Sequence, residues 1–184
     1  AFQAKIDYAR TFGKHDVGAT IVYMQKERNM NISDEQEYAA LPYRQQGLAG
    51  RVTYGFDKRY LFEANFGYNG SENFSPNHRF GFFPSIALGY VVSNEKFFAP
   101  IRDVVSMVKL KASYGLVGND QIGGDRRFIY NETINTSGGS YQFGTGNTTY
   151  TGLCLGNWAN DSVGWEKAYK LNVGAEVSLF GKLR

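Results

Sequence analysis

The feature that most constrains this chain is a period-two alternation of apolar and polar residues, repeated in seven long segments. Successive side chains of a β-strand point to opposite faces of a sheet, so this period predicts strands with one apolar and one polar face. The segments cover residues 2–12, 17–26, 48–56, 60–69, 80–92, 108–116 and 165–179. Most are about 9 to 15 residues long, whereas strands of globular proteins have about 5 or 6 and a tilted membrane-crossing strand needs about 9 to 11. The excess length favours a transmembrane β-barrel over a soluble sandwich.

The connections between these segments alternate between short turns and long polar loops. Short turns are expected at 13–16, 57–59 and 181–182, and long loops at 29–43, 70–79 and 118–164. Outer-membrane barrels have this pattern, with short turns on the periplasmic side and long loops outside.

Three places depart from the simple pattern. The link 93–106 is too long for a turn, and its part 97–105 predicts a helical turn. Pro84 interrupts the fifth segment, which predicts a strand start, an edge or a bulge. The pieces 127–132 and 141–143 of the longest loop look strand-like, and its Gly, Asn, Ser and Thr predict a β-hairpin or a disordered tip.

Composition excludes several classes of protein. No run of about 18 apolar residues exists, which excludes a helical membrane protein, and an aromatic content of 16% argues against disorder. A net charge of +3, scattered along the chain, gives no nucleic-acid footprint. We interpret Arg126-Arg127 as solvated loop charge.

A search for chemistry predicts no enzyme, no cofactor and no metal site. His15 and His78 stand far apart, and Cys154 has no partner in a recognisable motif. Asn119-Asp120 with Asp125 offers a weak cation site, and a solvated turn is the preferred interpretation because acids are few.

Polar and aromatic side chains supply the candidate site residues. The polar positions are expected to face a hydrated barrel interior. They are Arg51, Thr53, Glu63, Asn65, Asn69, Lys109, Lys111, Ser113, Lys170, Asn172 and Glu176. Loop aromatics are candidates for stacking on sugar rings or for contacting a lid protein, with loop packing as the alternative. They are Tyr130, Tyr141, Phe143, Tyr150 and Trp158.

A further set of aromatics lies near the segment ends, where membrane proteins carry interfacial girdles. It comprises Phe12, Tyr23, Tyr54, Phe56, Tyr60, Tyr68, Tyr90, Tyr114 and Trp165.

Several motif-like stretches occur in a consistent order along most of the chain, from about Phe2 to Leu179. They are 48–64, 70–74, 79–85, 110–120, 165–167 and 172–174. Together they resemble the SusC/RagA-type TonB-dependent transporters of Bacteroidetes.

The resemblance implies a fold and a role. Members of this family have a 22-stranded barrel with an N-terminal plug. They import oligosaccharides or peptides with energy relayed by TonB, and a SusD-like surface lipoprotein closes over the substrate as a lid. The resemblance thus implies a Gram-negative outer membrane, with a lipid bilayer, a lid lipoprotein and the TonB complex as partners.

The extent of the match makes 1–184 a part of such a barrel, about seven or eight strands from its C-terminal part. The chain contains no plug domain or TonB box and begins and ends within the pattern, which indicates a fragment of a longer protein. Two alternatives remain open. One is a free-standing small outer-membrane barrel with a structural or adhesive role. The other is a soluble β-sandwich or lipocalin-like binding protein.

Overall fold

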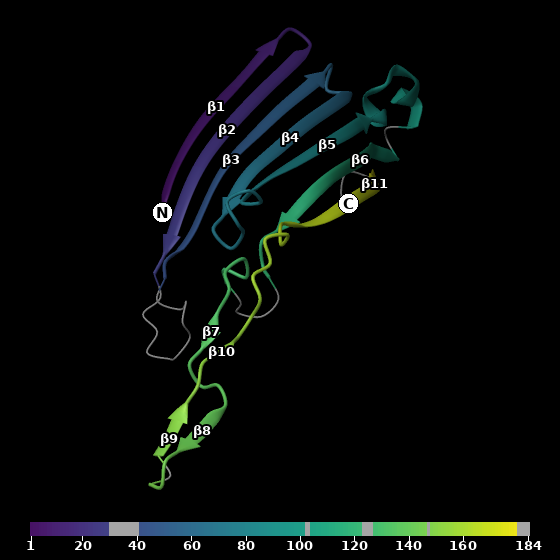
Figure 1. Ribbon diagram of the computed structural model, residues 1–184. Coiled ribbons are helices and arrows are strands. Elements are labelled where there is room, and N and C mark those ends of the chain that lie inside the picture. Colours follow the sequence, from purple (N-terminus) through teal and green to yellow (C-terminus); the bar gives the residue numbers. More distant parts are fainter. Residues whose placement is uncertain (30–40, 102–103, 123–126, 147, 180–184) are drawn as a thin grey trace.

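A computed structural model describes residues 1–29, 41–101, 104–122, 127–146 and 148–179. The architecture is all-β, with seven long strands in one antiparallel sheet (Figure 1). The strands are β1 (Phe2–Phe12), β2 (His15–Arg28), β3 (Tyr43–Phe56), β4 (Tyr60–Ser71), β5 (Phe80–Val91), β6 (Val105–Asn119) and β11 (Glu166–Leu179). Their order in the sheet is β1-β2-β3-β4-β5-β6-β11, so chain neighbours pair throughout.

The predicted long strands are therefore confirmed, at 11 to 15 residues each. Several extend beyond the alternating pattern: β3 begins at Tyr43, five positions before the predicted segment, because Gln45 and Gln46 already pair with both β2 and β4. The sheet continues there although its residues are polar on both faces.

The two faces of the sheet differ sharply. Each cross-strand pair places both partners on the same face, so the register groups Tyr54, Phe62 and Leu88 on one side and Thr53, Glu63 and Ala87 on the other. We call these the apolar face and the polar face. A sheet normally buries its apolar face against another layer, but here Ile6 is 73% and Val173 77% exposed. In the described part of the chain, the buried apolar side chains are Phe74, Phe83 and Phe98.

The open, single-layer sheet does not match either alternative hypothesis. A free-standing barrel would pair β1 with β11, yet these strands are the two outermost ones. A sandwich would place a second sheet over the first, whereas the two other sheets of the described residues are two-stranded hairpins. The architecture is that of one portion of a barrel wall.

The connections have the expected alternation. Gly13 takes a φ of 60° in the β1–β2 turn, and Asp57 and Lys58 take φ values of 52° and 53° in the β3–β4 turn. Positive φ at these positions gives hairpin turns whose twist matches that of the strands. The β5–β6 link carries two 3₁₀ helices, η1 (Val92–Asn94) and η2 (Lys96–Ile101), in agreement with the predicted helical turn. These connections lie at one end of the sheet, the turn end; the long loops lie at the other, the loop end. The predicted turn at 181–182 lies outside the described residues.

Pro84 lies inside β5 and is not its first residue. It pairs with Phe66 of β4, but the pairing of β5 with β6 begins only at Ser85. Proline has no N–H to donate, and the part of β5 from Phe80 to Pro84 forms an edge on the β6 side. Of the predicted alternatives, the edge is correct.

The loop between β6 and β11 contains four short strands. β7 (Ile134–Asn135) pairs with β10 (Cys154–Leu155), and β8 (Ser140–Phe143) pairs with β9 (Thr148–Thr151). The hairpin prediction at 141–143 is thus confirmed. The strand-like interpretation of 127–132 is wrong, because Phe128 has a φ of 53° and accepts a turn hydrogen bond from the N–H of Asn131 at 2.8 Å. Among the described residues, no helix is long and apolar enough to span a membrane.

Candidate functional site

The polar face carries ion pairs between neighbouring strands. Arg51 Nη2 lies 2.6 Å from Glu63 Oε2, and Asn65 donates to the other oxygen of Glu63 at 2.9 Å. On the β6–β11 pair, Lys111 Nζ lies 2.6 Å from Glu176 Oε1. Both ion pairs join neighbouring strands, and both are substantially exposed to solvent.

The remaining predicted polar positions share this face by register. Thr53 is opposite Glu63, Ser113 is opposite Asn172, and Lys109 is opposite Glu176. Asn69 is opposite Gly47, and Lys170 is opposite Gly115. The structure therefore brings all the polar candidates together on one face. It offers a surface of mixed charge suited to a hydrated or ligand-filled space.

At the loop end, residues from two separate stretches converge on Asp120. Its Oδ2 accepts hydrogen bonds from Tyr43 Oη at 2.5 Å, Gln45 Nε2 at 2.7 Å and Ser71 Oγ at 2.7 Å. Its backbone carbonyl accepts from Asn73 Nδ2 at 3.1 Å. We call these five residues the loop-end cluster. The interpretation of Asp120 as part of a solvated turn is therefore wrong, and Asp125 lies outside the described residues.

The electrostatics of Asp120 follow from these donors. Partial burial works to raise the pKa of the carboxyl group, but the hydrogen bonds from Tyr43, Ser71 and Gln45 outweigh it and hold the pKa below its ordinary value. The carboxylate is thus charged at neutral pH and joins the end of β6 to the ends of β3 and β4.

Three aromatic side chains pack beside this cluster. The ring of Trp165 lies 5.4 Å from that of Phe74 and 5.1 Å from that of Phe83, while its indole N–H donates to the Arg79 carbonyl at 3.1 Å. Phe74 is only 1% exposed. We call Phe74, Phe83 and Trp165 the aromatic wedge. The prediction that Trp165 belongs to an interfacial girdle is wrong, because its ring packs in this wedge between β5 and the loops.

The other end-of-strand aromatics do form groups. At the turn end, Tyr60 stacks on Phe56 and on Tyr90, with centroid distances of 6.4 and 5.2 Å. At the loop end, Tyr68 stacks on Phe80 at 5.2 Å.

Arg127 secures the loop in a way that the sequence did not reveal. Its guanidinium donates to the carbonyls of Leu41 at 2.7 Å and Pro42 at 2.9 Å, and it lies over the rings of Tyr43 and Phe128. This joins the start of β3 to the loop that follows β6. The interpretation of Arg127 as a solvated charge is therefore wrong; Arg126 lies outside the described residues.

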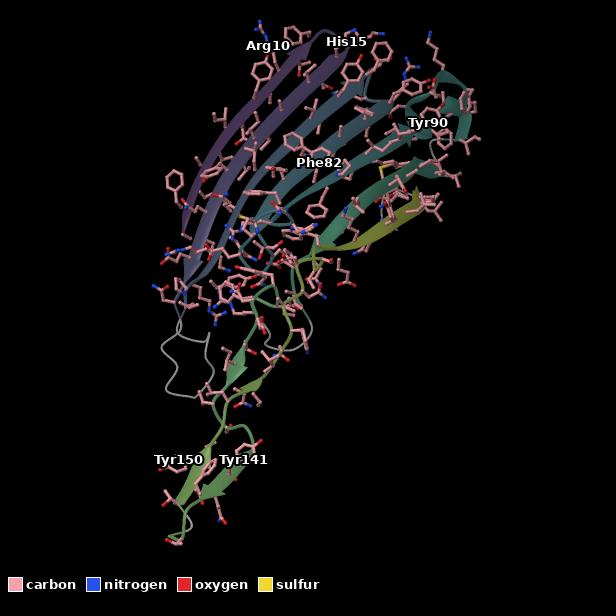
Figure 2. The ribbon with its side chains drawn as sticks, in the orientation of Figure 1. Arg10, His15, Phe82, Tyr90, Tyr141 and Tyr150 are labelled. Carbon is pink, nitrogen blue, oxygen red and sulfur yellow. The ribbon has the colours of Figure 1, made fainter. Side chains whose placement is uncertain are left out.

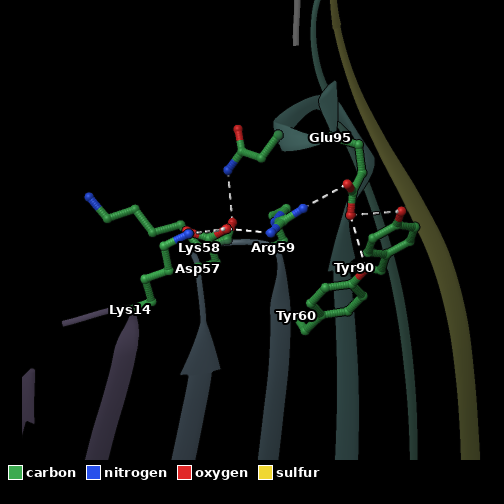
Figure 3. A network of polar contacts seen from close by, with 8 residues as sticks. Lys14, Asp57, Lys58, Arg59, Tyr60, Tyr90 and Glu95 are labelled. Carbon is green, nitrogen blue, oxygen red and sulfur yellow. Dashed lines mark hydrogen bonds and ion pairs between the residues drawn. The ribbon is translucent and has the colours of Figure 1, made fainter. Parts of the chain in front are cut away.

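A second polar network lies at the turn end of the sheet (Figure 3). Arg59 binds Asp57 and also Glu95, the latter at 2.8 Å, and Glu95 accepts from the hydroxyls of Tyr60 at 3.0 Å and Tyr90 at 3.2 Å. Partial burial works to raise the pKa of Glu95, but the hydrogen bonds from Arg59 and Tyr60 hold it below its ordinary value. The network ties the β3–β4 turn to the β5–β6 link.

The segment 133–160, which we call the arm, contains no charged residue and no histidine. Its hairpin β8–β9 projects away from the sheet (Figures 1 and 2). Tyr141 is directly opposite Tyr150, and the Phe143 ring lies 5.9 Å from that of Tyr150 in an edge-on arrangement. All three are about 60% exposed. The structure thus brings three of the five loop candidates together.

The other two loop candidates lie apart from that group. Tyr130 is half-buried, with its ring 6.0 Å from that of Phe128, whereas Trp158 follows β10 outside any strand and is 77% exposed. Cys154 is exposed. In the described ranges, no group of three or more His, Cys, Asp or Glu residues is placed to hold a metal ion.

These features define a class of protein: an antiparallel, long-stranded wall of the transmembrane-barrel type, with elaborated loops at one end. No family model matches the sequence. The chain is 30% identical over 154 residues to the TonB-dependent receptor SusC of Bacteroides thetaiotaomicron, a match that covers 84% of this chain and 15% of that protein. It is 28% identical over 180 residues to the TonB-dependent receptor P39 of Formosa agariphila, covering 98% of this chain and 15% of the relative.

Solved structures give the same result for the fold. The RagAB peptide transporter matches with a TM-score of 0.72 at 23% identity, over 97% of this chain and 21% of that one. The RagAB importer in its open-open state matches with a TM-score of 0.66. The chain is thus homologous to part of the TonB-dependent receptors, SusC among them, and shares its fold with part of the RagAB transporter. It spans about 15% of the length of the curated relatives it matches. These relatives are receptors and transporters, not enzymes.

Proposed function

We propose that residues 1–184 are part of the barrel wall of an outer-membrane importer that takes up oligosaccharides or peptides. In this proposal the energy comes from TonB, through parts of the protein outside this chain, and a SusD-like lipoprotein covers the loop end. One observation carries the proposal: a single-layer sheet whose apolar face is not covered by any layer of the described residues and whose other face bears ordered polar pairs. Lipid on one side and water on the other would satisfy both faces.

Site-directed spin labelling of the intact receptor in lipid bilayers tests this placement. Labels at Tyr60, Phe62, Ala64 and Phe66 should be accessible to a lipid-soluble quencher, and labels at Glu63 and Asn65 to a water-soluble one. The two sets alternate along β4, so local mobility cannot account for an alternating result. Equal accessibility of both sets would overturn the proposal.

The arm is proposed to contact the imported ligand or the lid. Three exposed rings, set among hydroxyl and amide side chains without charge, suit a neutral partner whose apolar surfaces can stack on aromatics. Replacing Tyr141, Phe143 and Tyr150 together by alanine should weaken uptake or lid binding by the intact importer. Gln142→Ala with Thr149→Ala is the matched control, because these residues pair on the opposite face of the same hairpin. Equal effects of the two variants would refute a specific role of the rings.

A further inference from the structure

The apolar face carries an unexpected pair of basic side chains at its turn end. Arg10 occupies a position that alternation assigns to the same face as Tyr8 and Phe12, and His15 is directly opposite Phe12. Both side chains are exposed, and Figure 2 shows them at the same end of the sheet. A charge on a lipid-facing strand is costly near the bilayer centre and costs little near the interface. The position of Arg10 and His15 at the rim of the apolar face is therefore consistent with the membrane interface.

Aromatic contacts hold both side chains in place. The guanidinium of Arg10 lies over the ring of Phe12, 4.7 Å from the centroid. The ring of His15 lies 5.0 Å from that of Phe56, and its Nδ1 shares a hydrogen bond with the Tyr54 hydroxyl at 2.8 Å. When Tyr54 donates that bond, the ring proton of His15 is on Nε2, the edge turned away from Tyr54.

The nearby acidic groups are already engaged. Asp16 accepts a hydrogen bond from Thr11 at 2.7 Å, and by alternation both lie on the polar face. Asp57 binds Lys14 and Arg59. Among the described residues, the Arg10 guanidinium contacts the ring of Phe12.

We propose that Arg10 and His15 form a binding site for the phosphate of a phospholipid headgroup in the leaflet at the turn end. Stacking on Phe12 covers one face of the guanidinium and leaves its N–H edge able to bind phosphate oxygens in a fork. The N–H of the His15 ring adds a second donor. Next to these two side chains, Tyr8, Val17 and Ala19 continue the apolar face, so the acyl chains attached to the phosphate meet apolar side chains.

This inference rests on the proposed function, because it needs the apolar face to meet lipid. The test uses the intact receptor, purified and delipidated, and titrated with phosphatidylglycerol while native mass spectrometry counts the retained lipids. The double variant Arg10→Gln/His15→Gln should bind the tightest lipid more weakly, by roughly fivefold for the removed charge of Arg10 and by a further factor for the removed ring N–H of His15. Lys109→Gln, a cation removed from the polar face near the same end, is the matched control and should not change it.

Three further arms separate the possible failures. Arg10→Lys in a His15 background keeps the charge but loses the fork, so its affinity should lie between those of wild type and Arg10→Gln. A loss as large as that of Arg10→Gln would show that the charge does not hold the lipid and would overturn the assignment. Inorganic phosphate at millimolar concentration should not displace the lipid; complete displacement would make this a soluble-anion site. In the variant Phe62→Trp, brominated lipid should quench the added tryptophan fluorescence. If it is quenched and lipid retention is the same in all variants, the headgroup site is wrong; if it is not quenched, the membrane placement itself fails.

Discussion

The hydroxyl oxygen of Tyr43 lies 2.5 Å from a carboxylate oxygen of Asp120, although 77 positions separate the two residues in the sequence. Through this contact and its neighbours, the strand end that carries the arm is attached to β3 and β4. At the loop end, hydrogen bonds between side chains thus hold the strands together, as backbone pairing does in the rest of the sheet.

Replacing Asp120 by asparagine should loosen this attachment. The substitution removes the charge that strengthens three hydrogen bonds, at a cost of about 1–2 kcal/mol. Limited proteolysis of the intact receptor should then cut the loop after β6 roughly 5 to 30 times faster. Asp161→Asn is the control, because Ser75 bonds the backbone carbonyl of Asp161 and the exposed carboxylate is not involved. Equal rates for wild type and Asp120→Asn would contradict the role of the cluster.

The same attachment should depend on pH. The pKa of Asp120 is lower in the folded protein than its ordinary value of 3.8, so its stabilising effect is complete above that value and is lost as the pH falls through the folded pKa. Proteolysis of the loop by an acid-active protease should accelerate below about pH 4. In Asp120→Asn the acceleration should be absent, and its persistence there would assign the effect to another group.

Removing the ring of Phe74 should open the aromatic wedge. Phe→Ala at a fully buried site costs about 3–5 kcal/mol, and here the lost contact is with Trp165. A cysteine at Ser75, which is 4% exposed, reports the change as faster thiol labelling once Cys154 has been replaced by serine. Phe97→Ala, at a side chain 66% exposed, should leave labelling unchanged.

Gly50 leaves room for an aromatic ring on the apolar face. A Cβ at this position would lie 2.2 Å from a ring carbon of its cross-strand partner Phe66. Gly50→Ala should therefore destabilise the intact barrel by about 1–3 kcal/mol. Chemical unfolding in lipid of the single variants and of Gly50→Ala/Phe66→Leu should show a coupling of about 0.5–3 kcal/mol, with the double variant partly rescued. Additive effects would mean that the ring moves aside without strain.

Sequence reasoning found the sheet because alternation is a local signal. Each strand such as β4 carries its own two-faced pattern, and the register follows once one face is apolar. The same reasoning placed Glu63 and Asn65 on the face of Arg51 before any pairing was known. It identified the aromatics of the arm, but it did not distinguish the group on β8 and β9 from Tyr130 and Trp158.

The loop end was missed because its interactions join distant stretches. Asp120 looks like a turn residue unless the hydroxyl of Tyr43 is known to be near, and Arg127 looks solvated unless the carbonyls of Leu41 and Pro42 are placed beside it. Trp165 continues the alternation of β11, yet its ring leaves that pattern to pack on Phe74 and Phe83. This one region contains residues from four of the motif stretches, 70–74, 79–85, 110–120 and 165–167. The presence of motifs in all four stretches was the sequence signal that could have indicated the region.

The late start of the β5–β6 ladder at Ser85 gives the wall a seam. From Phe80 to Pro84, β5 has no ladder partner in β6, and the Phe83 ring packs there on Trp165, the residue before β11. At this end β6 is held instead by its ladder with β11, which reaches Asn119, and by the side chains that bind Asp120. A pull on the loop after β6 is therefore expected to pass into the wall through β11 on one side and through β3 and β4 on the other, past β5. The load on the outer loop is shared between strands that are not adjacent in the wall.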